Sequence, residues 1–207
     1  MKVSFALAMT LCAAALTAAP PAQPSAEDEV VVPQSDGHSG LCEPFDCATR
    51  IQQIFDASTF PSSMRIDALE LFNDATQSAE SFVEPAHYQV YLSTTRASSA
   101  TLSADMDQNV GPNARLVAEF TVSDFSTFFT GAFRIPLAAP FVYARNAGNL
   151  LLEIRKDQTA NYGDGTIYVD GSVQAAGVAL ATDQFGVQPS VGMSVGFVGQ
   201  IIGPPER

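Results

Sequence analysis

Oxygen-bearing side chains alternate along the short stretch DMDQN. Asp105, Asp107 and Asn109 stand two residues apart, which is the spacing at which calcium loops present their first ligands. The helix-loop-helix calcium motif also needs glycine at its sixth position and a carboxylate at its twelfth, and here Val110 and Leu116 occupy those places. The stretch therefore predicts either an irregular calcium site or a solvated acidic loop.

A second acidic stretch, NYGDGTIYVDG, places Asn161, Asp164 and Asp170 close together in the sequence. The same calcium chemistry applies to these oxygen atoms. Asp-Gly pairs are also preferred in tight hairpin turns. For this stretch we favour the hairpin interpretation.

Tyrosines on strand surfaces suggest carbohydrate binding. Tyr91 and Tyr168 fall on the side of their predicted strands opposite the apolar residues. The chain has no tryptophan, so the strongest stacking platform for a sugar is missing. Exposed tyrosine is also common on strands because it fits the pleated surface. The two residues are candidate glycan ligands, with ordinary strand surface as the alternative.

Hydrolytic chemistry has little support in the residues. A glycosidase needs two carboxylates facing one another across a cleft, and the 22 acidic residues offer too many pairs to select one. A Ser-His-Asp arrangement would have to use His38 or His87. No G-x-S-x-G nucleophile elbow is present. We do not expect an enzyme.

Residues 1–19, MKVSFALAMTLCAAALTAA, have the composition of a secretory signal peptide. One positive charge at Lys2 precedes a short apolar run that ends in small residues. The run is too short and too rich in alanine for a good membrane span. We expect cleavage after Ala18 or Ala22, with an uncleaved anchor as the alternative. The protein is then secreted, periplasmic or attached to the cell surface, with no stable membrane insertion.

Export turns the cysteines into a question of disulfide pairing. Cys12 leaves with the signal peptide, and Cys42 and Cys47 remain in CEPFDC. Two nearby cysteines in an oxidising compartment most simply pair with one another. A metal site would need more ligands than two thiolates. We predict a disulfide that closes a short loop.

The charge balance excludes one class of partner. The chain has 22 acidic and 10 basic residues, for a net charge of -12, and Lys156 is the lysine that remains beyond Lys2. Such a surface repels phosphate backbones, so nucleic-acid binding is not expected. No cofactor is indicated apart from the candidate calcium ion.

Short apolar runs with period-two alternation recur along the chain and are separated by turn residues. This pattern predicts an antiparallel β-sandwich of jelly-roll type with about 8–10 strands. The predicted strands cover residues 50–55, 63–72, 87–93, 114–123, 131–137, 149–155, 165–171 and 191–201. The predicted divisions are a signal peptide at 1–19, a flexible leader at 20–48, the sandwich at 49–202 and a tail at 203–207.

Several strands carry finer predictions. A register shift before Leu69 suggests a β-bulge in 63–72. Pro136 cannot donate to a ladder, so its strand should lie at an edge or end there. Leu116, together with Ala118, Phe120 and Val122, is expected on the buried face of 114–123. The leader run VVV at 30–32 is a candidate additional strand, which could pair with a sheet edge of the same chain or of a neighbouring copy.

The order of these strands resembles a group of secreted bacterial β-sandwich proteins, many of which carry a PEP-CTERM sorting tail. The resemblance rests on RIQQIFDASTF, MRIDALELF, YQVYLSTT, NVGPNARLVAEF and RIPLAAPFVYARNAGNLLLEIR, and covers roughly residues 50–200. After Gln200 the sequence is IIGPPER, without the Pro-Glu-Pro motif. The resemblance implies an exported jelly-roll-like sandwich and assigns no catalytic residue.

These observations predict an exported, non-catalytic structural or adhesive protein. A carbohydrate-binding module, assisted by calcium, is the alternative, and a glycan-acting hydrolase is the third. The expected partners are an extracellular polysaccharide or further copies of the chain.

Overall fold

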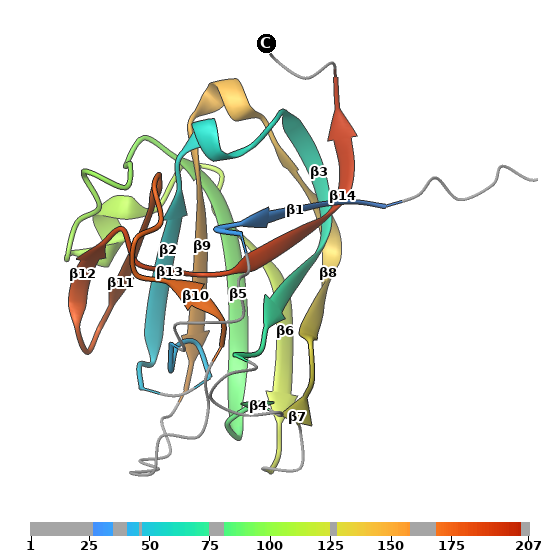
Figure 1. Cartoon of the computed structure of the whole chain (residues 1–207), viewed down its shortest axis with the longest axis vertical. Coiled ribbons are helices and arrows are strands. Elements are labelled where there is room, and N and C mark those ends of the chain that lie inside the picture. The colour runs from blue at the N-terminus through green and yellow to red at the C-terminus, as the bar shows by residue number, and fades with distance from the viewer. Residues whose placement is uncertain are drawn as a thin grey trace, which may run out of the picture.

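Two antiparallel sheets stack against one another in the computed structural model (Figure 1). The structure describes residues 27–34, 41–45, 47–74, 81–124, 128–157 and 169–203. The larger sheet has six strands in the order β12-β11-β2-β9-β5-β6, and the smaller has four in the order β1-β14-β3-β8. The prediction of an all-β antiparallel sandwich is confirmed, and these two sheets together have the upper number of strands expected.

The chain passes repeatedly from one sheet to the other, so sequence neighbours rarely pair. The larger sheet consists of β2 (Arg50–Phe55), β5 (Ala86–Thr95), β6 (Arg115–Val122), β9 (Asn149–Lys156), β11 (Val178–Thr182) and β12 (Gly186–Pro189). The smaller sheet consists of β1 (Asp28–Val32), β3 (Ser63–Phe72), β8 (Ala132–Tyr143) and β14 (Val195–Ile202). Two short ladders pair β4 (Ser81–Phe82) with β7 (Phe128–Phe129), and β10 (Gly171–Ser172) with β13 (Gly192–Met193). Three 3-10 turns complete the described chain: η1 (Ala57–Thr59), η2 (Met106–Asn109) and η3 (Arg145–Ala147).

Aromatic side chains fill the space between the two sheets. The ring of Phe197 in β14 meets that of Phe55 in β2 edge to face, with centroids 5.0 Å apart. Phe60 lies 5.2 Å from Phe197 and 4.9 Å from Tyr143. Edge-to-face ring pairs at these separations are favourable beyond the area that they bury. The two sheets are therefore held together at their centre by ring packing.

A second, smaller core lies on the outer side of the larger sheet. Ile54 of β2 and Leu151 of β9 point away from the main core, yet both are fully buried. The loop between β5 and β6 covers them with Leu102 and Met106. Around Ile54 and Leu151 these central strands are thus apolar on both faces, which weakens the alternation in their sequences.

The smaller sheet confirms two of the finer predictions. β3 shifts register against both neighbours around Asp67, so a β-bulge interrupts the strand before Leu69. β8 is the edge strand of this sheet, and Pro136 lies within it. Proline cannot donate a ladder hydrogen bond. An edge strand tolerates it because one side of the strand has no partner strand.

The predicted faces of residues 114–123 are wrong in one respect. Leu116 is 39% exposed and Val117 is 1% exposed, the reverse of the expectation. The pairing of β6 with β5 shifts between Val90 and Tyr91, where β6 has one extra residue. A bulge of this kind moves side chains to the opposite face, and no alternation in the sequence marks it.

The sandwich begins earlier in the chain than residue 49. β1, which contains the predicted VVV strand, pairs with β14 at a sheet edge. The ring of Phe45 is 1% exposed and packs among core aromatic rings, 6.0 Å from Tyr88. β1 and Phe45 therefore pack with the sandwich, although both precede residue 49. The disulfide between Cys42 and Cys47 is confirmed, with Cα atoms 5.8 Å apart.

Some expectations fall outside the described residues. They include the signal peptide at 1–19, the cysteine Cys12, the histidine His38 and most of the strand predicted at 165–171. Strands β11 and β12 were not predicted, because the run VALAT is buried throughout and shows no alternation. In the part of the chain that the structure describes, no helix is long and apolar enough to cross a membrane.

Candidate functional site

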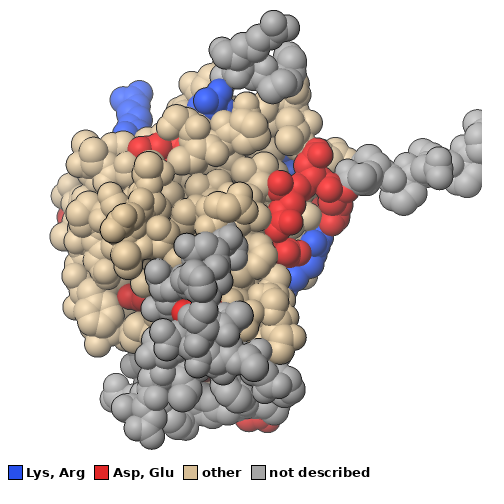
Figure 2. Space-filling view, viewed as in Figure 1, with Lys and Arg blue, Asp and Glu red and all other residues tan. Residues whose placement is uncertain are grey.

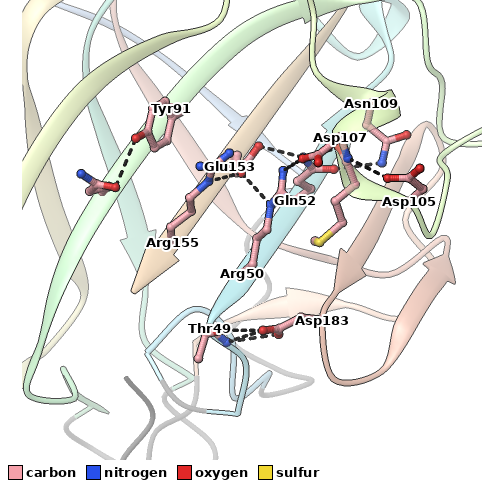
Figure 3. A network of polar contacts seen from close by, with 12 residues as sticks. Thr49, Arg50, Gln52, Tyr91, Asp105, Asp107, Asn109, Glu153, Arg155 and Asp183 are labelled. Carbon is pink, nitrogen blue, oxygen red and sulfur yellow. Dashed lines mark hydrogen bonds and ion pairs between the residues drawn. The ribbon is translucent and has the colours of Figure 1, made fainter. Parts of the chain in front are cut away.

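Polar side chains of four neighbouring strands gather on the outer face of the larger sheet. We call this surface the polar face and define it by the following residues: Arg50 and Gln52 of β2, Glu153 and Arg155 of β9, His87, Gln89 and Tyr91 of β5, and Glu119 and Thr121 of β6. Residues two apart on a strand share a face. The paired strands β2, β9, β5 and β6 thus bring these side chains into contiguous rows. Figure 3 shows the part of the rows that contains Arg50, Gln52, Glu153, Arg155 and Tyr91.

Glu153 is the centre of one hydrogen-bonded group. Its carboxylate accepts from Arg50 Nε at 2.8 Å and from Gln52 Nε2 at 2.7 Å, and it also accepts from Arg155 Nε. Its side chain is 4% exposed. Three donors around one nearly buried carboxylate fix the orientation of both guanidinium groups. Arg50 continues outward to Asp107, which lies 2.8 Å from its Nη2 atom.

Tyr91 connects this group to the next strands. The guanidinium of Arg155 lies over its ring, 4.8 Å from the centroid, in a cation–π contact. The Tyr91 hydroxyl donates to Gln89 Oε1 at 3.2 Å. The ring is therefore held on one face and at its tip.

Glu119 is the centre of the second group. Its Oε1 atom accepts from Gln89 Nε2 at 2.9 Å and lies 2.9 Å from His87 Nε2. The other ring nitrogen of His87 lies 3.1 Å from Thr121 Oγ1. The hydrogen bonds from Gln89 and then His87 hold the pKa of Glu119 below its ordinary value. Glu119 is thus a carboxylate that stays ionised on an exposed surface.

Together the contacts form an unbroken chain from Asp107 to Thr121. The order of the chain is Asp107, Arg50, Glu153, Arg155, Tyr91, Gln89, Glu119, His87 and Thr121. It offers donors and acceptors in alternation around a single aromatic ring. Such a surface suits a flat, uncharged ligand with many hydroxyl groups.

A groove of about 240 Å³ adjoins the polar face at Glu119, where β6 meets β8. Its lining is largely apolar and includes Phe120, Phe133 and Ile135. At Glu119 the polar face therefore borders a shallow groove.

The sequence-predicted calcium ligands have other roles in the structure. Asn109 is 1% exposed, and its amide bonds Ser103 N and O and the Gln52 side chain. Asp105 caps η2 through the amide of Asp107, and Asp107 pairs with Arg50. These three residues anchor the loop between β5 and β6. In the described ranges, no three or more His, Cys, Asp or Glu side chains are grouped so as to hold a metal ion.

The other candidates are placed as follows. Tyr91 lies at the middle of the polar face, whereas Tyr168, Asn161 and Asp164 are outside the described residues. Asp170 is described, is 0% exposed and directly precedes β10. The structure thus links Tyr91 to His87 through Gln89 and Glu119, and to Asp107 through Arg155, Glu153 and Arg50.

Sequence reasoning missed Arg50, Glu153 and Arg155. The available signal was the pair of ionic residues two positions apart in the otherwise apolar strand NLLLEIRK. Charges at alternate positions of a central strand demand a polar partner on the same face. The side chains that contact Glu153 and Arg155 come from β2 and β5, which are far from β9 in the sequence. They could be identified only once the pairing of these strands was known.

Comparisons with known proteins assign no family. No protein-family model matches the chain, and no curated protein matches it. A solved structure of the clostridial cysteine protease Cwp84 after propeptide cleavage is similar, with a TM-score of 0.47 and 12% identity. The match covers 84% of this chain and 41% of that protein. The chain spans less than half the length of that protease, and the likeness is too low to carry a functional argument.

Proposed function

We propose that this protein is an exported, non-catalytic adhesive protein that binds neutral polysaccharide on the polar face. The observation that carries the proposal is the unbroken chain of side-chain contacts with Tyr91 at its middle. The disulfide between Cys42 and Cys47 supports an oxidising location outside the cytoplasm.

The rigidity of the polar face supports binding. The Tyr91 ring is held by Arg155 and Gln89 before any ligand arrives. Ordering loose side chains costs free energy on association, and a pre-ordered surface avoids much of that cost. Hydroxyl groups of a sugar both donate and accept, and the alternating partners on this face match them.

Charge selects neutral over anionic sugars. The polar face carries two guanidinium groups, from Arg50 and Arg155, against the carboxylates of Asp107, Glu119 and Glu153. The chain as a whole carries a net charge of -12. A polyanion such as a uronic-acid polymer would be repelled at long range.

The carboxylates of the face do not suit hydrolysis. A glycosidase needs one carboxylic acid whose pKa is raised so that it can donate a proton. The pKa of Glu119 is shifted downward, and Glu153 is surrounded by three donors. This supports binding without catalysis.

The structural alternative, assembly through strand edges, has less support. Edge strand β8 contains Pro136 and Pro140, and edge strand β12 ends at Pro189. Prolines on edge strands oppose pairing with another chain. Prolines thus oppose pairing at two of the four edges of these sheets, β8 and β12, and leave β1 and β6 as the edges at which polymerisation would have to occur.

The test is binding to a panel of neutral and uronic-acid polysaccharides, by array and then by titration calorimetry. We expect a neutral polymer to bind, and Tyr91→Ala to weaken its affinity about tenfold or more, equivalent to about 1.4 kcal/mol. Phe185→Ala is the matched control, because Phe185 is 52% exposed and lies off the polar face. Absence of binding across the panel, or binding that Tyr91→Ala and Arg155→Ala leave unchanged, would overturn the proposal.

A further inference from the structure

The end of the smaller sheet contains a junction of three chain segments. The amide of Asp170 donates to the Phe72 carbonyl at 2.8 Å, and the Ser194 amide donates to the Asp170 carbonyl at 2.8 Å. Asp170 immediately precedes β10, whose residue Gly171 pairs with Met193. Asp170 therefore lies between the end of β3 and the start of β14, directly opposite both Phe72 and Ser194.

Polar side chains are buried at this junction. Asp170 is 0% exposed and Ser194 is 1% exposed. Among the residues that the structure describes, neither carboxylate oxygen of Asp170 has a hydrogen-bond partner, and neither does the Ser194 hydroxyl. A buried carboxylate without hydrogen bonds or a counter-charge is strongly unfavourable. A bound cation would remove this cost.

The register places a second carboxylate beside the first. Side chains directly opposite on paired strands share a face with Cβ atoms about 4.5–5.5 Å apart, and diagonal neighbours lie about 7–8 Å apart. Asn73 pairs with Val169, so Asp74 follows Phe72 by two residues and falls on the face of Asp170. Asp74 is also 0% exposed. The register thus places the side chains of Asp74, Asp170 and Ser194 on one face of the junction.

We propose that Asp170, Asp74 and Ser194 bind a calcium ion at this junction. The donor set consists of oxygen atoms alone, which hard cations prefer, and calcium accepts ligands at 2.3–2.6 Å in irregular geometry. The two oxygens of Asp170 and the hydroxyl of Ser194 carry the proposal, and Asp74 supplies a further carboxylate on the same face. This site is separate from the loop of Asp105 and Asp107, and it is independent of the proposed polysaccharide binding.

The ion would fasten chain segments that are distant in the sequence. Asp74 follows β3, Asp170 precedes β10 and Ser194 separates β13 from β14. With two carboxylates, the affinity belongs to the weak range of extracellular modules, with a Kd of roughly 10⁻⁴–10⁻³ M. Such a Kd suits a compartment in which calcium is abundant.

The test combines calorimetric titration of calcium chloride with thermal unfolding of the whole protein in calcium or in chelator. A site that binds only the native state raises the unfolding midpoint, by roughly 3–10 °C at 10 mM calcium for this affinity and chain length. We expect Asp170→Asn to abolish both the heat of binding and the shift. In chelator the same variant should unfold no earlier than the wild type, because a buried charge has been removed.

The double variant Asp105→Asn/Asp107→Asn is the control, and it should keep both the binding and the shift. Ser194→Ala should weaken calcium binding several-fold, and it keeps the test decisive if Asp170→Asn does not fold. The proposal is overturned if calcium up to 10 mM leaves the wild-type midpoint unchanged. It is also overturned if Asp170→Asn keeps the shift, or if the double variant alone removes it.

Discussion

Lys156 and Glu84 form an ion pair inside the sandwich, with their side chains 0% and 1% exposed. The ammonium of Lys156 donates directly to a carboxylate oxygen of Glu84. The hydroxyl of Tyr88 donates to the main-chain carbonyl of Glu84 at 2.8 Å, which holds this turn against β5. Beyond Lys2, the chain has therefore placed its remaining lysine where solvent does not reach.

Removing the ammonium should be costly. We expect Lys156→Met to lower the free energy of unfolding by about 3–5 kcal/mol, because the buried carboxylate of Glu84 loses its counter-charge. Urea denaturation measures the change. The double variant Lys156→Met/Glu84→Leu should recover most of the loss, since an apolar pair of similar volume replaces the buried ion pair. If the double variant is as unstable as the single one, packing rather than charge governs this site.

Asn109 should matter for stability and Asp107 should not. Asn109→Ala removes three buried hydrogen bonds that hold the loop to Ser103 and Gln52, and we expect a loss of about 2–4 kcal/mol. Asp107→Asn removes an ion pair of a side chain that is 81% exposed, and we expect less than about 1 kcal/mol. Denaturant unfolding of both variants, with calcium and with chelator, checks the contrast. Equal losses that appear only in calcium would restore the calcium interpretation of this loop.

The bulge of β3 requires glycine in the neighbouring strand. A Cβ atom on Gly199 would lie 1.8 Å from the Arg65 carbonyl oxygen, at the point where β14 shifts register against β3. We expect Gly199→Ala to cost about 3 kcal/mol or more, because backbone has to move to relieve the contact. Gly186→Ala is the comparison, since its Cβ would meet nothing within 4 Å and its φ of +69° imposes only local strain. That strain costs about 1–2 kcal/mol, so equal unfolding midpoints for the two variants would contradict the steric explanation.

The two register shifts also show how far the sequence determines this fold. In β3 the apolar pattern changes phase between Met64 and Leu69, so the bulge at Asp67 was predictable. In β6 the residues alternate evenly, and the shift that buries Val117 arises from the pairing with β5. Local pattern fixes which segments are strands, whereas pairing partners decide the face of each side chain near a bulge.

The polar face likewise depends partly on the local sequence pattern and partly on strand pairing. Tyr91 could be named as a candidate because the alternation within its own strand is enough to place it on the outer face. The role of Glu153 depends on Arg50 and Gln52 from a strand about a hundred residues earlier in the chain. Sequence periodicity contains no information on which strands become neighbours, so this network could be found only from the fold.

Opposite pH dependences are expected for two glutamates on opposite faces of the sandwich. Figure 2 shows acidic side chains gathered beside β1, with basic atoms at their border. There Arg134 pairs with Glu27 and with Glu70, each at 2.8 Å. Burial, and then the neighbouring Glu70, raise the pKa of Glu29 above 4.5, although Arg134 opposes this shift. On the polar face, hydrogen bonds lower the pKa of Glu119.

The signs follow from linkage between proton binding and folding. The folded state favours protonated Glu29, so this contribution to stability is present below pH 4.5 and is lost as the pH rises through the folded pKa. Glu29→Gln should therefore raise the thermal midpoint at pH 7, and the difference should vanish in acid. The contribution of Glu119 is present above pH 4.5 and is lost as the pH falls through its folded pKa, so Glu119→Gln should lower the midpoint at pH 7 and not in acid. Melting curves of both variants from pH 3 to pH 8 measure the differences, and shifts of the same sign at pH 7 would show that one of these two environments has been wrongly described.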